Sequence, residues 1–132
     1  MLLFVCTGNT CRSPMAAALC RSRGIDAQSA GLSADSGNPA TDQAVQAAHR
    51  HGADLSGHLS RPVTRSLIHD ADQILVMTPA HAITLQTRFP EAAHRVRVLQ
   101  PAIPDPFGGD DAVYEDCILH ILEALKNAGV IP

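Results

Sequence analysis

The residues best suited to chemistry lie in one loop near the start of the chain. The loop reads Cys6-Thr7-Gly8-Asn9-Thr10-Cys11-Arg12-Ser13. Gly8 and Asn9 tolerate positive φ, so the loop can turn successive amide N–H groups toward a bound anion. The planar guanidinium of Arg12 can bind two phosphoryl oxygens at once. The same positive field favours the thiolate of Cys6, and the loop therefore predicts a cysteine nucleophile that attacks phosphorus.

Three other interpretations of this loop are weaker. A nucleotide-binding loop would need a second glycine followed by Lys and Ser or Thr, and both are absent. A structural zinc site on Cys6 and Cys11 would need two further ligands, and no second Cys or His pair has the spacing of a zinc finger. An inert core cysteine is disfavoured for Cys6, because Gly, Asn, Arg and Ser neighbours make a poor core segment. That interpretation suits Cys20 and Cys117, which fall on apolar faces of predicted helices.

A carboxylic acid that could serve the same reaction lies near the end of the chain. Asp105 stands between Pro104 and Pro106, and Phe107-Gly108-Gly109 follows. Cleavage of a phosphoryl bond requires a proton for the leaving group, which a carboxylic acid can supply. Asp-Pro is also common in turns, so the signal is moderate alone. Together with the Cys6 loop it predicts that Asp105 is a general acid.

Short apolar runs alternate with helical segments along the chain, and this alternation predicts a parallel sheet with helices on both faces. The strands are expected at 2–5, 26–30, 73–77 and 95–99. The helices are expected at 13–23, with Ser13 as N-cap, and at 39–51, 64–71, 78–89 and 110–128. In the last helix, the residues expected to face the core are Val113, Cys117, Leu119, Ile121, Leu122 and Leu125. Ligands bind at the carboxyl ends of such strands, which is where the Cys6 loop begins.

Length and charge narrow the classes of protein. The 132 residues fit one domain, 1–132, and 45% hydrophobic residues suit a globular fold. A net charge of −3 argues against a nucleic-acid or anionic-membrane partner. No basic leader or membrane-length apolar stretch is visible, so we expect a soluble, cytoplasmic protein with reduced cysteines.

The run from Cys6 to Pro14, together with Asp105-Pro106, resembles the low-molecular-weight protein tyrosine phosphatase family, and the resemblance spans nearly the whole chain. It implies a three-layer α/β fold with a doubly wound, four-stranded parallel sheet. It also implies Cys6 as nucleophile, Arg12 as phosphate binder and Asp105 as general acid and then base. The other implied substrate- and phosphate-binding residues are Thr7, Gly8, Asn9, Thr10, Cys11 and Ser13. Because the loop supplies positive charge, no metal or organic cofactor is expected.

The same resemblance implies roles for residues that support the loop. Ser13 would donate a hydrogen bond to the cysteine sulfur, and Asn9, Ser29 and His58 would hold the loop in shape. Cys11 would be the redox partner of Cys6, pairing with it reversibly and protecting it from overoxidation.

Within the family, three features resemble the bacterial protein-arginine phosphatases. Thr10 stands where tyrosine-specific members usually have Ile, only Phe107 follows Asp-Pro as an aromatic wall, and His81 follows the third strand. Thr10 narrows the pocket and suits a slim guanidinium, while the missing second aromatic removes a stacking surface for a phenol ring. We therefore expect phosphorylated proteins as substrates, phosphoarginine as the modified side chain and inorganic phosphate as product. Phosphotyrosine is the alternative, and a phosphate-binding or redox-switch module without activity is the rival from another class.

Overall fold

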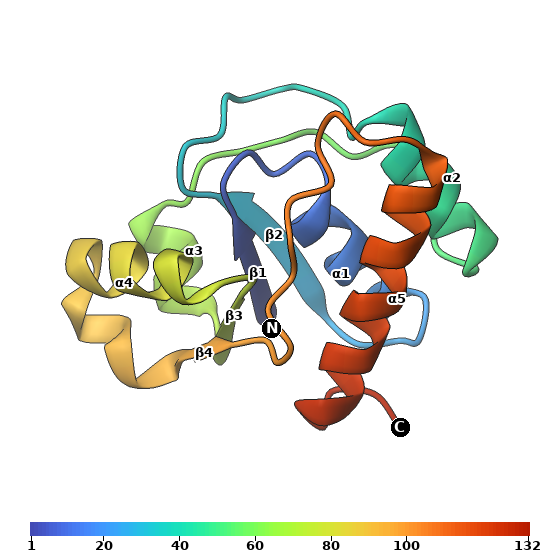
Figure 1. Cartoon of the computed structure of the whole chain (residues 1–132). Coiled ribbons are helices and arrows are strands. Elements are labelled where there is room, and N and C mark those ends of the chain that lie inside the picture. Colours follow the sequence, from blue (N-terminus) through green and yellow to red (C-terminus); the bar gives the residue numbers. More distant parts are fainter.

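The computed structural model describes all 132 residues and contains a four-stranded sheet in which every strand runs parallel to its neighbours. The strands are β1 (Leu2–Cys6), β2 (Ala27–Gly31), β3 (Gln73–Val76) and β4 (Val96–Val98). Their spatial order is β2-β1-β3-β4 (Figure 1). The order reverses direction between β1 and β3, so the carboxyl end of β1 lies at the position where open α/β sheets bind ligands.

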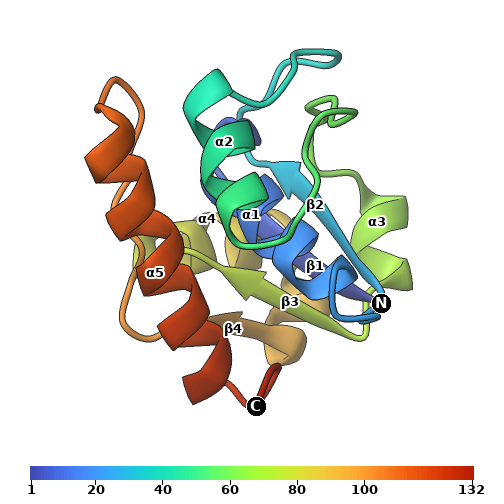
Figure 2. The ribbon, with the colours of Figure 1, turned by 90° about the vertical axis from the view of Figure 1, so that its right-hand side faces the viewer.

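Helices cover both faces of this sheet, which confirms the three-layer, doubly wound fold (Figures 1 and 2). One face carries α1 (Arg12–Arg21), α2 (Asp42–Arg50) and α5 (Asp111–Asn127). The other face carries α3 (Arg65–Asp70) and α4 (Pro79–Arg88). A 3₁₀ helix, Pro90–Arg95, links α4 to β4. None of these helices combines the length and apolar character that a membrane crossing needs.

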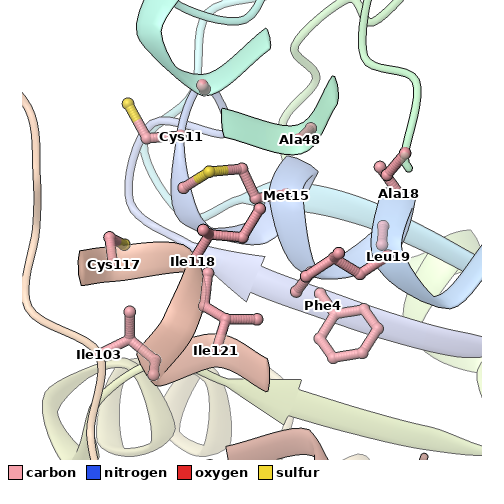
Figure 3. Packing of buried hydrophobic residues seen from close by; sticks show 14 of the residues in the cluster. Phe4, Cys11, Met15, Ala18, Leu19, Ala48, Ile103, Cys117, Ile118 and Ile121 are labelled. Carbon is pink, nitrogen blue, oxygen red and sulfur yellow. The ribbon is translucent and has the colours of Figure 1, made fainter. Parts of the chain in front are cut away.

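Strand β1 is buried on both faces because helices pack above and below it. Its side chains alternate between two clusters: Phe4 and Cys6 belong to the cluster under α1 and α5, whereas Leu3 and Val5 belong to the cluster under α3 and α4. In Figure 3, Leu19 of α1 lies close to Phe4, and Ile121 of α5 projects into the same cluster. Two packed faces fix β1, and with it the position of Cys6 at its end.

The start of α1 differs from the prediction. The N-cap is Cys11 rather than Ser13, and its side chain makes no capping hydrogen bond. The loop after β1 determines this start, because it must deliver the first amides of α1 to the carboxyl edge of the sheet. Ser13 consequently lies inside the first turn, where its hydroxyl is free for another partner. Helix α2 also begins later than predicted, because Thr41 caps it and Pro39 pairs with Leu59 instead.

The inward face of α5 also differs in part from the prediction. Val113 and Leu119 are exposed, whereas Tyr114 and Ile118 are buried. The buried residues of this helix follow the 3.6-residue period and are Tyr114, Cys117, Ile118, Ile121, Ala124 and Leu125. Leu119 lies off that stripe, and Val113 lies beside Gly109 in the first turn.

Two arginines cover the outer edge of β2. Arg21 Nη1 donates to the carbonyl of Ala27 at 3.2 Å, and Arg61 Nε donates to the carbonyl of Ser29 at 3.1 Å. These carbonyls belong to β2, which pairs with β1 on one side and on the other has only an isolated bridge between Gly31 and Pro62. Edge groups that would otherwise be unpaired are therefore satisfied by side chains.

Gly31 links the end of β2 to the loop after β1. A Cβ at this position would lie 2.5 Å from the Thr7 carbonyl oxygen and 2.7 Å from Ala34 Cβ. We expect Gly31→Ala to lower the free energy of unfolding in urea by about 1–3 kcal/mol, because backbone and core atoms would have to shift. Gly57→Ala is the control, since a Cβ there meets nothing within 4 Å. Equal stability of the two variants would contradict this close approach.

Candidate active site

The loop between β1 and α1 forms the floor of a pocket of about 200 Å³. The segment that precedes α5 contributes the opposite wall and rises to the same end of the sheet (Figure 1). The structure thus brings Asp105 next to the loop that contains Cys6 and Arg12. The residues that line the pocket are Cys6, Thr7, Gly8, Asn9, Thr10, Cys11, Arg12, Asp105 and Phe107.

Asn9 organises the loop from the inside. Its φ is 57°, the only positive value among non-glycine residues, whereas Gly8 does not need one. Its fully buried amide donates from Nδ2 to Ser13 Oγ at 3.0 Å and to Ser29 Oγ at 2.9 Å. Its Oδ1 accepts from the backbone N–H of Arg61 at 3.0 Å. Three bonds to one buried side chain hold the left-handed turn in place.

His58 supports the same residue from a segment 49 positions later in the chain. Its Nε2 lies 2.7 Å from the carbonyl oxygen of Asn9 and donates to it, since a carbonyl can only accept. Burial, assisted by the charges of Arg21 and Arg61, holds the pKa of His58 below its usual value. His58 therefore acts here as a neutral donor.

The sulfur of Cys6 has a hydroxyl as its nearest polar partner. Ser13 Oγ lies 2.8 Å from Cys6 Sγ. Ser13 Oγ already accepts from Asn9, and its proton can go to the sulfur at 2.8 Å or to the Ala30 carbonyl oxygen at 3.5 Å. The shorter contact is the one to the sulfur, and such a bond stabilises a thiolate. Cys6 is 2% exposed and faces the N-terminal end of α1, where the helix dipole also favours negative charge.

Arg12 and Asp105 face each other across the pocket. Arg12 is buried, and its Nη1 donates to the carbonyl of Ile103 at 3.0 Å. Its Nη2 lies 3.8 Å from Asp105 Oδ2. The Asp105 side chain is 57% exposed, and its Oδ1 accepts from the backbone N–H of Phe107 at 3.1 Å. The guanidinium is thus fixed, whereas the carboxylate stands at the solvent side where a substrate would enter.

The four cysteines are free thiols in distinct surroundings. Burial raises the pKa of Cys20 to about 11 and that of Cys117 to about 12, so both are neutral core thiols as expected. Cys11 Sγ lies 3.2 Å from the hydroxyl of Tyr114, whose pKa burial and Cys11 raise to about 12. Cys6 and Cys11 both line the pocket and both have hydroxyl partners, but Cys6 has the shorter contact, 2.8 Å to Ser13 Oγ.

The residues for a metal site are not assembled. No group of three or more His, Cys, Asp or Glu side chains lies close enough to hold one ion. The zinc interpretation of Cys6 and Cys11 therefore lacks its further ligands.

Two side chains at the site are not among the predicted site residues. His81 Nε2 lies 2.9 Å from Thr7 Oγ1, and Tyr114 contacts Cys11. Both lie in the first turn of a helix that begins at the carboxyl edge of the sheet, after the caps Thr78 and Asp110. A polar residue at such a position in the sequence is the signal that could have identified them.

Comparisons with known proteins agree on one family. A family model described as "Low molecular weight phosphotyrosine protein phosphatase" matches residues 1–128. A probable low molecular weight protein-tyrosine-phosphatase, EpsP, from Ralstonia solanacearum is 41% identical over 91% of this chain and 87% of its own length. A protein-arginine-phosphatase from Bacillus subtilis is 35% identical over 96% of this chain and 92% of its own. The solved structure of the YwlE arginine phosphatase from Geobacillus stearothermophilus superposes with a TM-score of 0.91 at 35% identity, covering 96% of this chain and 88% of that one.

The buried state of His81 predicts a dependence of stability on pH. Burial and the charge of Arg12 lower its pKa to about 4, while Asp105 opposes them. As the pH falls below the ordinary value of about 6.5, the unfolded chain takes up a proton that the folded chain refuses, so stability is lost. The free energy of unfolding in urea should therefore fall as the pH is lowered from 7 to 5. The fall should be roughly 2 kcal/mol larger in the wild type than in His81→Gln, whose side chain cannot titrate.

The control for this comparison is His120→Gln, because His120 is exposed on α5. This variant should follow the wild type. Parallel pH curves for the wild type and His81→Gln would contradict the assignment.

Proposed function

Because the chain belongs to the family of low molecular weight phosphotyrosine protein phosphatases, which are hydrolases of phosphorylated protein side chains, we propose that it removes phosphate through a phosphocysteine intermediate on Cys6, with phosphoarginine as its preferred substrate. The observation that carries this proposal is the single pocket that holds the Cys6 sulfur, the Arg12 guanidinium and the Asp105 carboxyl group. Each of the three is needed at a different stage of the reaction.

In the first step the thiolate of Cys6 attacks phosphorus in line with the leaving group. The S–P bond forms as the P–N bond of phosphoarginine, or the P–O bond of phosphotyrosine, breaks. Asp105 in its protonated form gives its proton to the departing atom. The 57% exposure of the Asp105 side chain leaves it accessible to a leaving group that extends toward solvent.

Arg12 and the loop stabilise the charge that develops on the phosphoryl oxygens. The guanidinium is held by the Ile103 carbonyl before any substrate arrives, so little rearrangement is needed during the reaction. The N–H groups of the loop and of the first turn of α1 supply the remaining donors. These groups provide the positive charge that a bound cation would otherwise bring.

In the second step water attacks the phosphocysteine. Asp105, now a carboxylate, accepts a proton from the water as the new P–O bond forms. The S–P bond breaks, inorganic phosphate leaves and the thiolate returns, with the Ser13 hydroxyl as its partner at 2.8 Å. One carboxyl group thus serves as acid and then as base.

The walls of the pocket support phosphoarginine as the substrate. Thr10 lines the pocket at the position where tyrosine-specific members usually have Ile. Phe107 is the only aromatic side chain in the lining, and Gly108 and Gly109 follow it. A single wall suits the slim, polar guanidinium better than a phenol ring, which gains from stacking on two sides. Similarity to the arginine phosphatases also supports this choice, and phosphotyrosine is the alternative because EpsP is as similar.

The intermediate can be tested directly. We expect rapid acid quenching of a reaction, followed by mass spectrometry, to show a phosphoryl group on Cys6 in the wild type. Cys6→Ser should lose turnover but still bind vanadate. Asp105→Asn should keep the adduct detectable and slow turnover roughly 10²–10⁴-fold, the contribution expected of a general acid.

Asp116→Asn is the matched control for Asp105, since it removes a carboxylate from α5 outside the active-site pocket. Release of phosphate by the wild type without any adduct on Cys6 would refute the covalent mechanism. Turnover of Cys6→Ser within tenfold of the wild type would do the same.

The substrate preference can be tested at Thr10. Thr10→Ile should lower the ratio of kcat/KM on a phosphoarginine peptide to that on a matched phosphotyrosine peptide by about tenfold or more, a change of ~1.4 kcal/mol in relative transition-state binding. The ratio cancels any loss of folded protein. Thr10→Ser, which keeps a small side chain with a hydroxyl, should leave the ratio near that of the wild type. An unchanged ratio in Thr10→Ile would remove the role of Thr10 in specificity.

A further inference from the structure

Thr7 and His81 form a hydrogen-bonded pair at the rim of the pocket, and the mechanism above does not use it. His81 lies in the first turn of α4, 74 residues from Thr7 in the chain. The residue is 7% exposed, and its Nε2 lies 2.9 Å from Thr7 Oγ1. Its second ring nitrogen, Nδ1, is buried without any hydrogen-bond partner. A buried polar atom without a hydrogen-bond partner is rare in proteins, so the position of this ring calls for an explanation.

The surroundings of the ring determine which nitrogen carries the proton. A neutral imidazole has one N–H, and burial together with Arg12 keeps this ring neutral, with a pKa of about 4. A proton on Nδ1 would leave a buried N–H unpaired in the positive field of Arg12 and of the α4 N-terminus. A lone pair on Nδ1 avoids that unpaired N–H, whereas Nε2 has the Thr7 hydroxyl as its partner. The proton therefore resides on Nε2, which donates to Thr7.

This tautomer leaves the Thr7 hydroxyl with an unused proton. A threonine hydroxyl has one donor and two acceptor positions, and the bond from His81 occupies an acceptor position. No other hydrogen bond of the Thr7 hydroxyl is present, and Thr7 is exposed in the lining of the pocket. Thr7 also directly follows the nucleophile, so its side chain stands beside the site of attack.

Building on the proposed function, we propose that His81 is a positioning residue that holds the Thr7 hydroxyl so that its proton binds a phosphoryl oxygen of the substrate. The phosphoryl group is the acceptor of choice, because the guanidino nitrogens of phosphoarginine are mainly donors. Thr7 then adds a side-chain donor to the backbone donors of the loop. The Thr7 hydroxyl makes this hydrogen bond to the phosphoryl group of a bound substrate and to bound inorganic phosphate alike.

The test compares variants that remove or retain each group. Thr7→Val and His81→Leu should each raise the inhibition constant of inorganic phosphate and the KM roughly threefold to tenfold, as expected for one lost hydrogen bond to a charged group. kcat should change by less than about twofold, because the bond is made before and during the reaction. The double variant should be no weaker than either single variant, since both remove the same bond.

Conservative variants separate this role from a merely structural one. Thr7→Ser keeps the hydroxyl and His81→Gln keeps a neutral N–H donor, so both should recover most of the phosphate affinity. Thr87→Val makes the same kind of change on the exposed side of α4 and should behave as the wild type. Should His81→Leu fail to fold, Thr7→Val and the spectrum described next still decide the question.

The tautomer can be read without any assay of activity. Imidazole ¹⁵N chemical shifts of the wild-type protein should show His81 protonated on Nε2. A proton on Nδ1, unchanged phosphate affinity in Thr7→Val, or additive losses in the double variant would each overturn the inference. If the wild type binds phosphate but hydrolyses no phosphorylated peptide, the proposed function fails, and the phosphate titrations still test the Thr7–His81 pair.

Discussion

The geometry of the active-site loop depends on one buried side chain in an unfavourable backbone conformation. Asn9 adopts a positive φ, which few residues other than glycine tolerate, and its carbonyl and amide are held by His58, Ser13, Ser29 and the backbone of Arg61. The bond from Asn9 to Ser13 has a second effect. Since it occupies an acceptor position on Ser13, the Ser13 hydroxyl can donate to the Cys6 sulfur at 2.8 Å, which is closer than the Ala30 carbonyl oxygen at 3.5 Å. The shape of the loop and the surroundings of the Cys6 sulfur are therefore set together.

Features determined by short stretches of sequence could be predicted. The continuous apolar run of β1 reflects burial on two faces, and Thr78-Pro79 marks the start of α4 because both residues act within one turn. The Cys6 loop is a local motif, so its residues were identified together. Asp105 lies nearly a hundred positions later, and the topology of a parallel sheet, which gathers strand ends at one edge, makes its approach to Arg12 predictable.

Features that depend on distant partners could not be predicted from local pattern. The capping preference of Ser13 is overridden because the loop delivers the amides of α1 to the pocket, so the helix begins at Arg12. The phase of α5 is set by contacts with α1 and α2, which leaves Leu119 outside the buried stripe. The bond between Thr7 and His81 joins the residue after β1 to one in the first turn of α4, and only the folded sheet brings these two positions together.

The guanidinium groups along β2 have a consequence for how copies of this protein meet one another. An added strand would have to bond to the outward carbonyls of Ala27 and Ser29, but Arg21 and Arg61 already occupy them. The added strand would first have to displace the two guanidinium groups, and these charged groups would then lie beside its own backbone. Edge-to-edge growth into extended β assemblies is thus blocked at this edge, and the strand that flanks β1 stays free of foreign backbone.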